Sequence, residues 1–352
     1  RKFEGTPEKV INLFSFIAED VRNILASLGF ATLNEVIGRT DLLHQVLRGA
    51  DYLDDLDLNS LLAQADPGPH ARYCTREGRN EVPETLDAQM IADARPLFDH
   101  GEKMQLQYNV QNTHRAIGTR ISSLIVRQFG MDKLVPGHLT VRLRGSAGQS
   151  LGAFAVQGLK LEVLGDANDY VGKGLSGATI IVRQSPSSNL VSNENAIIGN
   201  TVLYGATAGA LYAAGQAGER FAVRNSGAIG VVEGCGSNGC EYMTGGLVVI
   251  LGEIGDNFGA GFTGGMAFVY DASGTFEERV NADTLTWARV SDPKWEAALR
   301  EQVETHVRET SSRYAELLLH NWDKVLPRFW HVVPREYAKV IGFAPAELPR
   351  SA

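Results

Sequence analysis

Hydrophobic residues at the start of the chain recur at the spacing of an amphipathic helix. Thr6 is suited to cap such a helix and Pro7 to occupy its first position. The apolar positions are Val10, Ile11, Leu13, Phe14, Ile17, Val21, Ile24, Leu25 and Leu28. They predict a helix with one face buried against something larger. The sequence TLNE at 32–35 has the form of a capping box for a short second helix, which Gly38 would end, and a third helix can start at Thr40.

The pattern then weakens and returns in short segments. Residues 51–83 are rich in Asp and contain the sequence DPGP, which cannot hold a regular helix or strand, so we interpret them as a linker. Alternating apolar positions predict strands at 104–110 and 139–143, and helical spacing predicts a helix at 113–129. Helical spacing returns from residue 292, followed by a concentration of Trp and Phe. This predicts a helical arm packed on a partner surface.

Residues 145–274 differ in composition from the rest of the chain. They hold 27 of its 38 glycines, one proline and no tryptophan. Glycine at this density among Val and Ile indicates many tight turns between short strands. Glycines precede six apolar runs, at Gly158, Gly177, Gly209, Gly227, Gly246 and Gly265. The intervals are 19, 32, 18, 19 and 19 residues, and the 13-residue polar segment Gln184–Ala196 explains the long interval as an insertion.

Four asparagines keep nearly the same period. They are Asn168, Asn200, Asn238 and Asn257, spaced by 32, 38 and 19 residues. In a parallel β-helix each turn of chain lies on the previous one, so inward-facing amides one repeat apart can form a hydrogen-bonded ladder. The sequence therefore predicts a mainly β fold, a parallel β-helix with glycines at its corners and helical segments capping its open ends.

The dinucleotide-binding pattern G-x-G-x-x-G occurs three times in this region. The copies are GKGLSG at 172–177, GCGSNG at 234–239 and GAGFTG at 259–264. A dinucleotide site uses one copy that follows a strand and opens a helix. The first and third copies are instead followed by β-branched and aromatic runs, which favour strands. We therefore expect turns of the repeat here and no nucleotide site.

Charge and composition exclude several classes of partner. A formal net charge of -8 argues against nucleic acid, and no apolar run is long enough to span a membrane, so the cytoplasm is the expected location. The chain begins with Arg1, and we expect it to be part of a longer polypeptide. Its three cysteines, Cys74, Cys235 and Cys240, are an odd number, which argues against a disulfide framework. Cys235 and Cys240 have no third ligand nearby in the sequence, which favours ordinary buried thiols over a metal site.

The sequence holds no recognisable catalytic constellation. Histidines are scattered without ligand spacing, at His100, His114, His138, His306, His320 and His331. Asp166 and Asp169 are expected to cap a turn rather than to act as an acid and base pair. We assign no catalytic, cofactor-binding or metal-ligating residue.

Several longer motifs resemble one known family. They are GSAGQSLGAF at 145–154, GDANDYVGKGLSG at 165–177, AIIGNTVLYGATAG at 196–209, GERFAVRNSGA at 218–228 and GCEYMTGG at 239–246. Together with TPEKVINLF, GRTDLL and YCTRE earlier in the chain, they resemble the C-terminal region of the large subunit of glutamate synthase, and most closely its bacterial NADPH-dependent form.

The resemblance implies an architecture. Residues 1–50 would be the terminal helices of an FMN-binding (β/α)8 synthase barrel, and 51–83 a linker. Residues 84–275 would form a right-handed parallel β-helix domain, and 276–352 a C-terminal helical arm. In this role the β-helix would position the amidotransferase and synthase domains, and the chain alone would be inactive.

The resemblance also implies the chemistry of the complete enzyme. It would make glutamate from glutamine and 2-oxoglutarate, using FMN and a 3Fe-4S cluster. Electrons would come from NADPH through a small subunit carrying FAD and 4Fe-4S clusters, in an oligomer. A ferredoxin-dependent relative would share much of this region. The nucleophilic Cys and the cluster ligands of the family lie upstream of the matched stretch, so no cofactor is expected to bind here.

Two other hypotheses for the function stay open. The first is a stand-alone, non-catalytic β-helix scaffold or adaptor, similar to the scaffold subunit of formylmethanofuran dehydrogenases. The second is polysaccharide cleavage in a β-helix groove, which would need clustered carboxylates and basic residues on one face. The repeats contain mostly Ala, Gly and Val, which disfavours the second reading.

Overall fold

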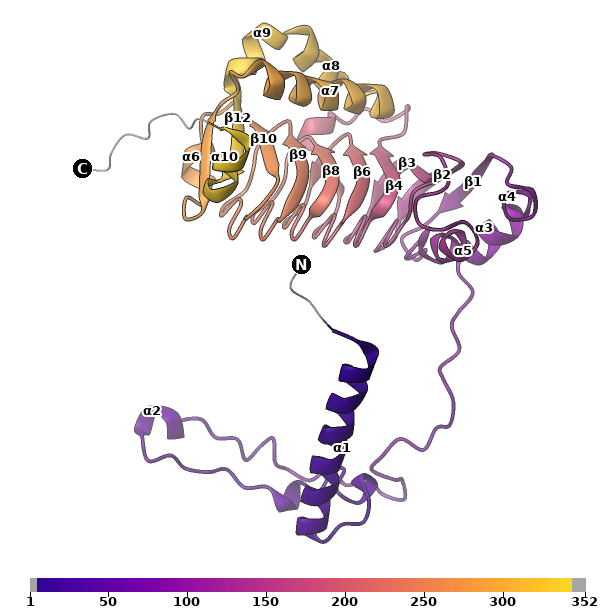
Figure 1. Ribbon diagram of the computed structural model, residues 1–352, viewed down its shortest axis with the longest axis vertical. Helices are drawn as coiled ribbons and strands as arrows, with labels where there is room; N and C mark the ends of the chain where they lie inside the picture. The colour runs from indigo at the N-terminus through magenta and orange to yellow at the C-terminus, as the bar shows by residue number, and fades with distance from the viewer. Residues whose placement is uncertain (1–4, 344–352) are drawn as a thin grey trace. The chain divides into compact units, whose positions relative to one another are not determined.

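The structure is a computed structural model that describes residues 5–343. The chain divides into two compact units, Arg1–Val82 and Pro83–Ala352. The first unit is formed mainly by helices and turns, and the second contains a mixed sheet of twelve strands with helices around it (Figure 1). The second unit is therefore mainly β, as predicted.

The first unit begins with the predicted helix, α1 (Pro7–Leu28). The hydroxyl of Thr6 accepts a hydrogen bond from the backbone N–H of Lys9, and Gly29 ends the helix in the left-handed conformation that glycine favours. The two shorter predicted helices are single 3-10 turns, η1 (Leu33–Glu35) and η2 (Thr40–Leu42), followed by α2 (Asp51–Asp54). No residue from 5 to 82 is buried, so the apolar face of α1 is exposed within the described residues.

The sheet of the second unit has the strand order β1-β2-β3-β4-β6-β8-β9-β10-β12-β11. Neighbours from β1 to β10 are parallel. The bounds are β1 (Met104–Val110), β2 (Leu139–Ala147), β3 (Leu159–Ala167), β4 (Ser176–Arg183), β6 (Ala208–Ala213), β8 (Ser226–Val232), β9 (Gly245–Ile250), β10 (Met266–Tyr270), β11 (Leu285–Arg289) and β12 (Phe329–Pro334). Two short strands, β5 (Ala196–Ile198) and β7 (Gln216–Ala217), pair beside this row.

The register of the sheet follows the repeat found in the sequence. Leu161 pairs with Ile180. Ile180 pairs with Leu211, although the 13-residue insertion separates Ile180 from Leu211 along the chain. The insertion therefore leaves the pairing intact. Alternate side chains point to two apolar clusters, one inside the stacked repeats and one beneath the C-terminal helices. Both faces are covered, as is usual for parallel strands.

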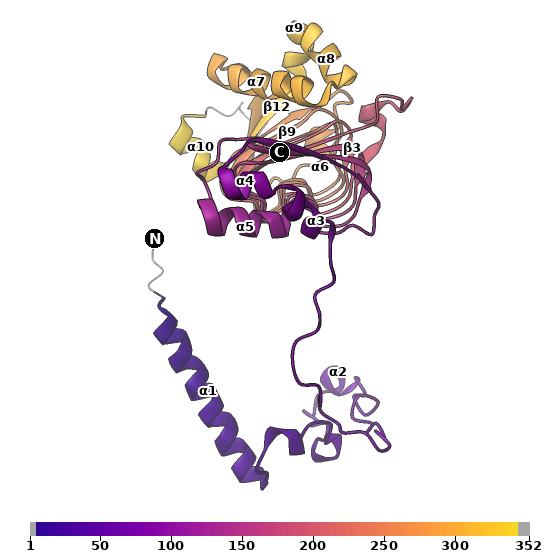
Figure 2. The same ribbon diagram turned by 90° about the vertical axis from the view of Figure 1, so that its right-hand side faces the viewer.

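Helices cover the sheet at two places (Figures 1 and 2). At the β1 end lie α3 (Leu86–Asp93), α4 (Arg95–His100) and α5 (Thr119–Phe129). Along one face, α7 (Pro293–Thr310) crosses β4, β6, β8 and β9, followed by α8 (Arg313–His320) and α9 (Trp322–Val325). The remaining helices are α6 (Phe276–Arg279), α10 (Arg335–Ile341), η3 (Ser192–Glu194) and η4 (Leu326–Arg328).

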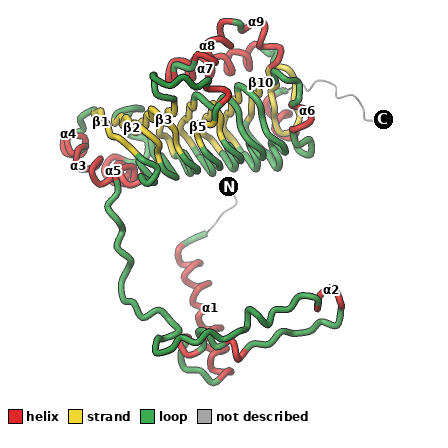
Figure 3. Tube along the Cα trace, turned by 180° about the vertical axis from the view of Figure 1, so that it is seen from behind, coloured by secondary structure: helices red, strands yellow, loops and turns green. Residues whose placement is uncertain are grey.

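The turns that join the strands share an unusual backbone. In each of six turns, three alternate residues have left-handed φ angles, and the turns lie side by side along the row of strands (Figure 3). The six triplets are Ser150/Gly152/Phe154, Tyr170/Gly172/Gly174, Thr201/Leu203/Gly205, Arg220/Ala222/Arg224, Asn238/Cys240/Tyr242 and Asn257/Gly259/Gly261. Residues other than glycine adopt this conformation at a cost of roughly 1–2 kcal/mol each.

Hydrogen bonds between turns offset this cost. In the fourth turn, the N–H groups of Arg220 and Arg224 donate to carbonyls of the following turn at 2.8 and 2.9 Å. The N–H of Ala222, between them, donates to the preceding turn at 2.8 Å. The left-handed residues thus point successive N–H groups in opposite directions, and each turn bonds to both of its neighbours. The stacking of repeats is carried by the backbone, which lets side chains vary.

Of the predicted asparagine ladder only the bond between Asn238 and Asn257 forms, and it lies on the surface and not inside, whereas Oδ1 of Asn168 accepts from the N–H of Asp169. The side-chain amide of Asn257 donates to Oδ1 of Asn238 at 2.9 Å, and that of Asn281 donates to Oδ1 of Asn257 at 2.9 Å, both in exposed positions. Oδ1 of Asn200 instead accepts from the N–H of Glu219 at 2.8 Å. The inward-facing placement was wrong because the interior is filled by apolar rings such as that of Phe258.

The C-terminal region is helical from Pro293, as predicted, but it also contains strands that the sequence pattern did not indicate. β12 pairs antiparallel with β10 on one side and with β11 on the other. Its sequence FWHVVP is aromatic and β-branched, which suits a strand. This pairing covers the last parallel strand, which would otherwise leave its backbone groups open to edge pairing.

Candidate functional site

The first glycine fingerprint lies in a turn, not at the start of a helix. Gly172 and Gly174 have left-handed φ angles of 65° and 62°, and β4 follows. Their N–H groups donate to the carbonyls of Leu151 and Tyr204, each at 2.8 Å. A phosphate cradle needs N–H groups that are free to point at the ligand. The geometry therefore supports the sequence-based interpretation of this motif as part of the repeat.

The two cysteines of the repeat region are buried side chains. Cys235 follows β8 closely and Cys240 is the central left-handed residue of its turn. Burial raises the pKa of the Cys235 thiol to about 12 and also raises the pKa of the Cys240 thiol. Cys74, in the first unit, is exposed. Between residues 5 and 343, no three side chains of His, Cys, Asp or Glu are placed to share a metal ion.

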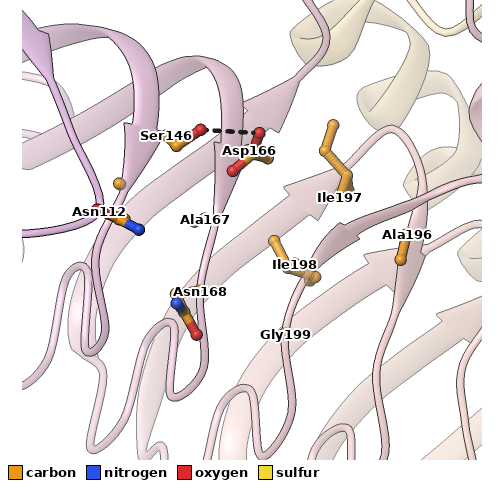
Figure 4. A pocket seen from close by; sticks show the side chains of 10 residues that line it. Asn112, Ser146, Asp166, Ala167, Asn168, Ala196, Ile197, Ile198 and Gly199 are labelled. Carbon is orange, nitrogen blue, oxygen red and sulfur yellow. Dashed lines mark hydrogen bonds between the residues drawn. The ribbon is translucent and has the colours of Figure 1, made fainter.

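Asp166 lines a surface hollow of about 380 Å³ between β3 and β5 (Figure 4), and Asp169 is not among its lining residues. Oδ2 of Asp166 accepts a hydrogen bond from the hydroxyl of Ser146 at 3.1 Å. Oδ1 of Asp169 accepts from the N–H of Asn200 at 2.8 Å, so Asp169 links its turn to the turn of the next repeat. Only Asp166 contributes a carboxylate to the lining of this hollow, and a single carboxylate without a second acid or base does not form an acid and base pair.

A buried polar cluster joins the C-terminal helices to the sheet. Glu233 directly follows β8, and Nε2 of His306 on α7 lies 3.1 Å from its Oε1. The hydroxyl of Ser312, which caps α8, donates to the same oxygen. The hydroxyl of Thr310 donates to the carbonyl of His306 at 2.6 Å. His306 and Ser312 thereby fix the corner between α7 and α8 to Glu233 at the end of β8.

The cluster is arranged for anchoring rather than for catalysis. Ser312 and His306 both contact the carboxylate of Glu233, whereas a nucleophilic serine needs the histidine as its own partner. Glu233 and His306 are 1% and 0% exposed, which leaves no access for a substrate. Oε2 of Glu233 and Nδ1 of His306 lack a hydrogen-bond partner in the described residues. Removing one member would therefore leave a poorly compensated polar group in the core.

His331 is a second buried histidine, on β12. Its ring stacks on Phe268 at 4.6 Å between centroids and meets Trp295 and Phe343 at 5.1 and 4.9 Å. Nε2 of His331 finds no partner among residues 5–343. Burial lowers the pKa of His331 to about 4, against a smaller opposing effect of Asp292. The sequence predicted no role for His331, which is one of the scattered histidines that lack the spacing of metal ligands.

Sequence reasoning missed Glu233 entirely. The available signal was its position at the end of the apolar run AIGVVE, where a carboxylate directly adjoins a buried strand. Its partners lie 73 and 79 residues further along the chain, so no local spacing could connect them.

Comparison with known proteins decides the family. A family described as the GXGXG motif matches residues 87–335. The chain belongs to the GXGXG motif family. Alternate glycines of this kind occur here at Gly172/Gly174 and Gly259/Gly261, where the backbone is left-handed. The motif thus coincides with the hydrogen-bonded turns that join successive repeats.

Relatives of this GXGXG motif protein are glutamate synthases. The large chain of the NADPH glutamate synthase of Azospirillum brasilense is 66% identical over 351 residues, which is 100% of this chain and 23% of that protein. The corresponding NADPH large chain of Bacillus subtilis is 41% identical over 97% of this chain, and the ferredoxin-dependent glutamate synthase 2 of Synechocystis is 42% identical over 95%. The chain spans less than a quarter of the length of these relatives.

No helix within residues 5–343 is long and apolar enough to cross a membrane.

Proposed function

We propose that this chain is the C-terminal part of a glutamate synthase large subunit and that it holds the amidotransferase and synthase domains at a fixed separation. The observation that carries the proposal is the 66% identity over 351 residues to one NADPH-dependent large chain. The hydrogen-bonded stacking of the turns supports a rigid role, because each turn is fixed by its neighbours on both sides. The relatives do not favour a stand-alone scaffold or a polysaccharide-cleaving enzyme.

The proposal includes a domain assignment. Residues 84–275 form a right-handed parallel β-helix, 276–352 the C-terminal arm, 51–83 a linker, and 1–50 the last helices of the FMN-binding barrel. The parallel register of the repeats supports the β-helix. The exposed apolar side chains of α1, such as Ile11, Phe14 and Phe16 at 63%, 64% and 69%, support packing of this helix on the rest of a barrel.

The complete enzyme, in this proposal, makes glutamate from glutamine and 2-oxoglutarate in the cytoplasm, with electrons from NADPH delivered by a small subunit that carries FAD and 4Fe-4S clusters. FMN and a 3Fe-4S cluster belong to the large subunit. The residues of this chain do not fit either group: two thiols are buried with raised pKa values, the third lies in the other unit, and the glycine N–H groups of the fingerprint are already bonded. This chain therefore contributes spacing and packing surface, and the cofactor chemistry resides upstream.

A glycine substitution in the full-length enzyme tests the rigid role. Gly209 has a φ of 95°, and a Cβ added there would lie 2.4 Å from the carbonyl oxygen of Ala178 in the neighbouring repeat. We expect Gly209→Ala to displace that repeat and to loosen the coupling of glutamine hydrolysis to glutamate formation, since an error of about 1 Å at a reacting centre can cost about a hundredfold in rate.

Gly205→Ala is the matched control. Gly205 also has a left-handed φ, of 63°, but an added Cβ would meet no atom within 4 Å. It should retain tight coupling. The ratio of glutamine hydrolysed to glutamate formed is the quantity to measure, and equal ratios in the two variants, with Gly209→Ala shown to be folded, would contradict the rigid-spacer role.

A further inference from the structure

The insertion in the repeat forms one wall of a pocket. This pocket, of about 580 Å³, lies between residues 183–193 and the corner where α7 meets α8. Because Ile180 pairs with Leu211 directly, stacking of the repeats does not require the insertion. Insertions in repeat proteins map to loops on one face, which is often the binding face. The insertion therefore calls for a role other than stacking.

The walls of the pocket are held in place by hydrogen bonds. On the insertion side, the amide of Gln216 donates to the carbonyl of Asn193 at 2.7 Å, and that of Asn195 donates to the carbonyl of Val191 at 2.8 Å. On the helix side, Ser312 is tied to the buried carboxylate of Glu233. A pocket with both walls fixed loses little conformational entropy when it binds a ligand.

The charges that line the pocket are both positive. Arg183 lies at the end of β4 and Arg313 at the start of α8, so two separate elements bring them to one pocket. Neither guanidinium has an ion-pair or hydrogen-bond partner among residues 5–343, and the described lining contains no carboxylate. This pocket is locally cationic on a chain of net charge -8. Unpaired guanidinium groups present planar sets of donors that match carboxylate and phosphate oxygens.

The rest of the lining adds an apolar surface and hydroxyl groups. Leu190, Val191 and Leu317 are 60%, 51% and 62% exposed. Ser311 adds a hydroxyl beside Arg313, at a left-handed residue between the two helices. Apolar walls with a few convergent polar groups are typical of small-molecule sites. A ligand that satisfies all three features carries an anionic group on a short apolar body.

We propose that this pocket binds a small organic anion, a carboxylate or a phosphate ester, through Arg183 and Arg313. The site is separate from the chemistry proposed for the full enzyme and does not depend on it. Its occupant contacts both the insertion and the α7–α8 corner.

Calorimetric titration of the 352-residue chain at constant ionic strength tests the proposal. The probes are succinate for a dicarboxylate, phenyl phosphate for a phosphate ester, and succinamide as the uncharged counterpart of succinate. We expect saturable binding of succinate or phenyl phosphate, or of both, and none of succinamide. The first two probes thereby distinguish the two sources of anionic oxygen.

Two variants and one control assign the binding to the pocket. Arg183→Gln and Arg313→Gln should each weaken binding about tenfold, the effect of losing one charge-assisted hydrogen bond, and the double variant should abolish it. Arg308→Gln removes an exposed arginine of α7 that does not line the pocket and should leave the affinity unchanged. Thermal unfolding establishes that each variant is folded.

The proposal is overturned if neither anion binds saturably at millimolar concentration. It is also overturned if the folded double variant binds as well as the original chain, or if succinamide binds as tightly as succinate. In each of these cases the two arginines are not the anion receptors of the pocket.

Discussion

Lowering the pH should destabilise the second unit through His331. An unfolded chain takes up a proton on this histidine near pH 6.5, whereas the buried ring has a pKa of about 4. Between these values the unfolded state binds more protons, so the free energy of unfolding falls as the pH falls. The contribution of His331 to the free energy of unfolding is fully present above pH 6.5 and is lost progressively as the pH falls towards 4. The difference in pKa corresponds to about 3 kcal/mol as an upper limit.

The substitution His331→Phe separates this effect from all other titrations. The ring of His331 already sits among Phe268, Trp295 and Phe343, so a phenyl ring can take its place without leaving a polar nitrogen unpaired. Carboxylates titrate equally in both proteins. The difference between the original chain and the variant should therefore change with pH only through the histidine.

Urea unfolding followed by tryptophan fluorescence provides the assay, because Trp295 lies 5.1 Å from the His331 ring. Measurements above pH 6.5 and at steps down to pH 4 give the free energy of unfolding of each protein. The original chain should lose up to about 3 kcal/mol more than the variant over this interval. Parallel curves for the two proteins would refute the assignment of a depressed pKa to this ring.

Three further predictions concern buried and exposed contacts. Glu233→Ala should lower the free energy of unfolding, measured by urea unfolding, by about 3 kcal/mol, because His306 and Ser312 lose a buried acceptor. Glu233→Gln should cost less, and equal losses in both variants would contradict this prediction. Asn257→Ala should cost only about 1 kcal/mol in thermal unfolding, since its ladder is exposed, and a loss of several times that amount would show a buried role. In a thiol-reagent assay, Cys74 should react at once, whereas Cys235 and Cys240 should react only after denaturation; immediate reaction of all three would contradict their burial.

The repeat could be predicted from sequence because it depends on spacing alone. Glycines before apolar runs gave the period, and the excess in one interval gave the insertion, which the pairing of Ile180 with Leu211 confirms. The helix α1 was predictable for a similar reason, since Thr6, Pro7 and the apolar face are all local signals. The family was accessible from motifs of ten or more residues, and the comparisons confirm it.

Several features of the fold had no local signal. Left-handed backbone at Leu203, Ala222 and Arg224 cannot be read from residue type, because these residues avoid it in isolation. Only the Asn238–Asn257 bond of the predicted asparagine ladder forms, and it lies on the surface, since period alone does not say which way a corner residue points. β12 pairs with β10 and with β11, and both partner strands lie far from β12 along the chain.

What the sequence determined by itself is the periodic part of this protein: the repeat, its insertion, the first helix and the family. What only the tertiary structure decided is which polar side chains meet. Glu233 and His306 are 73 residues apart. Arg183 and Arg313 line one pocket from the end of β4 and the start of α8. Contacts between successive repeats can be predicted from spacing, because the contacting positions recur at a constant interval along the chain. Contacts between the sheet and the C-terminal helices occur once, and they arise only when a long segment folds back and the free energy of burial selects its position.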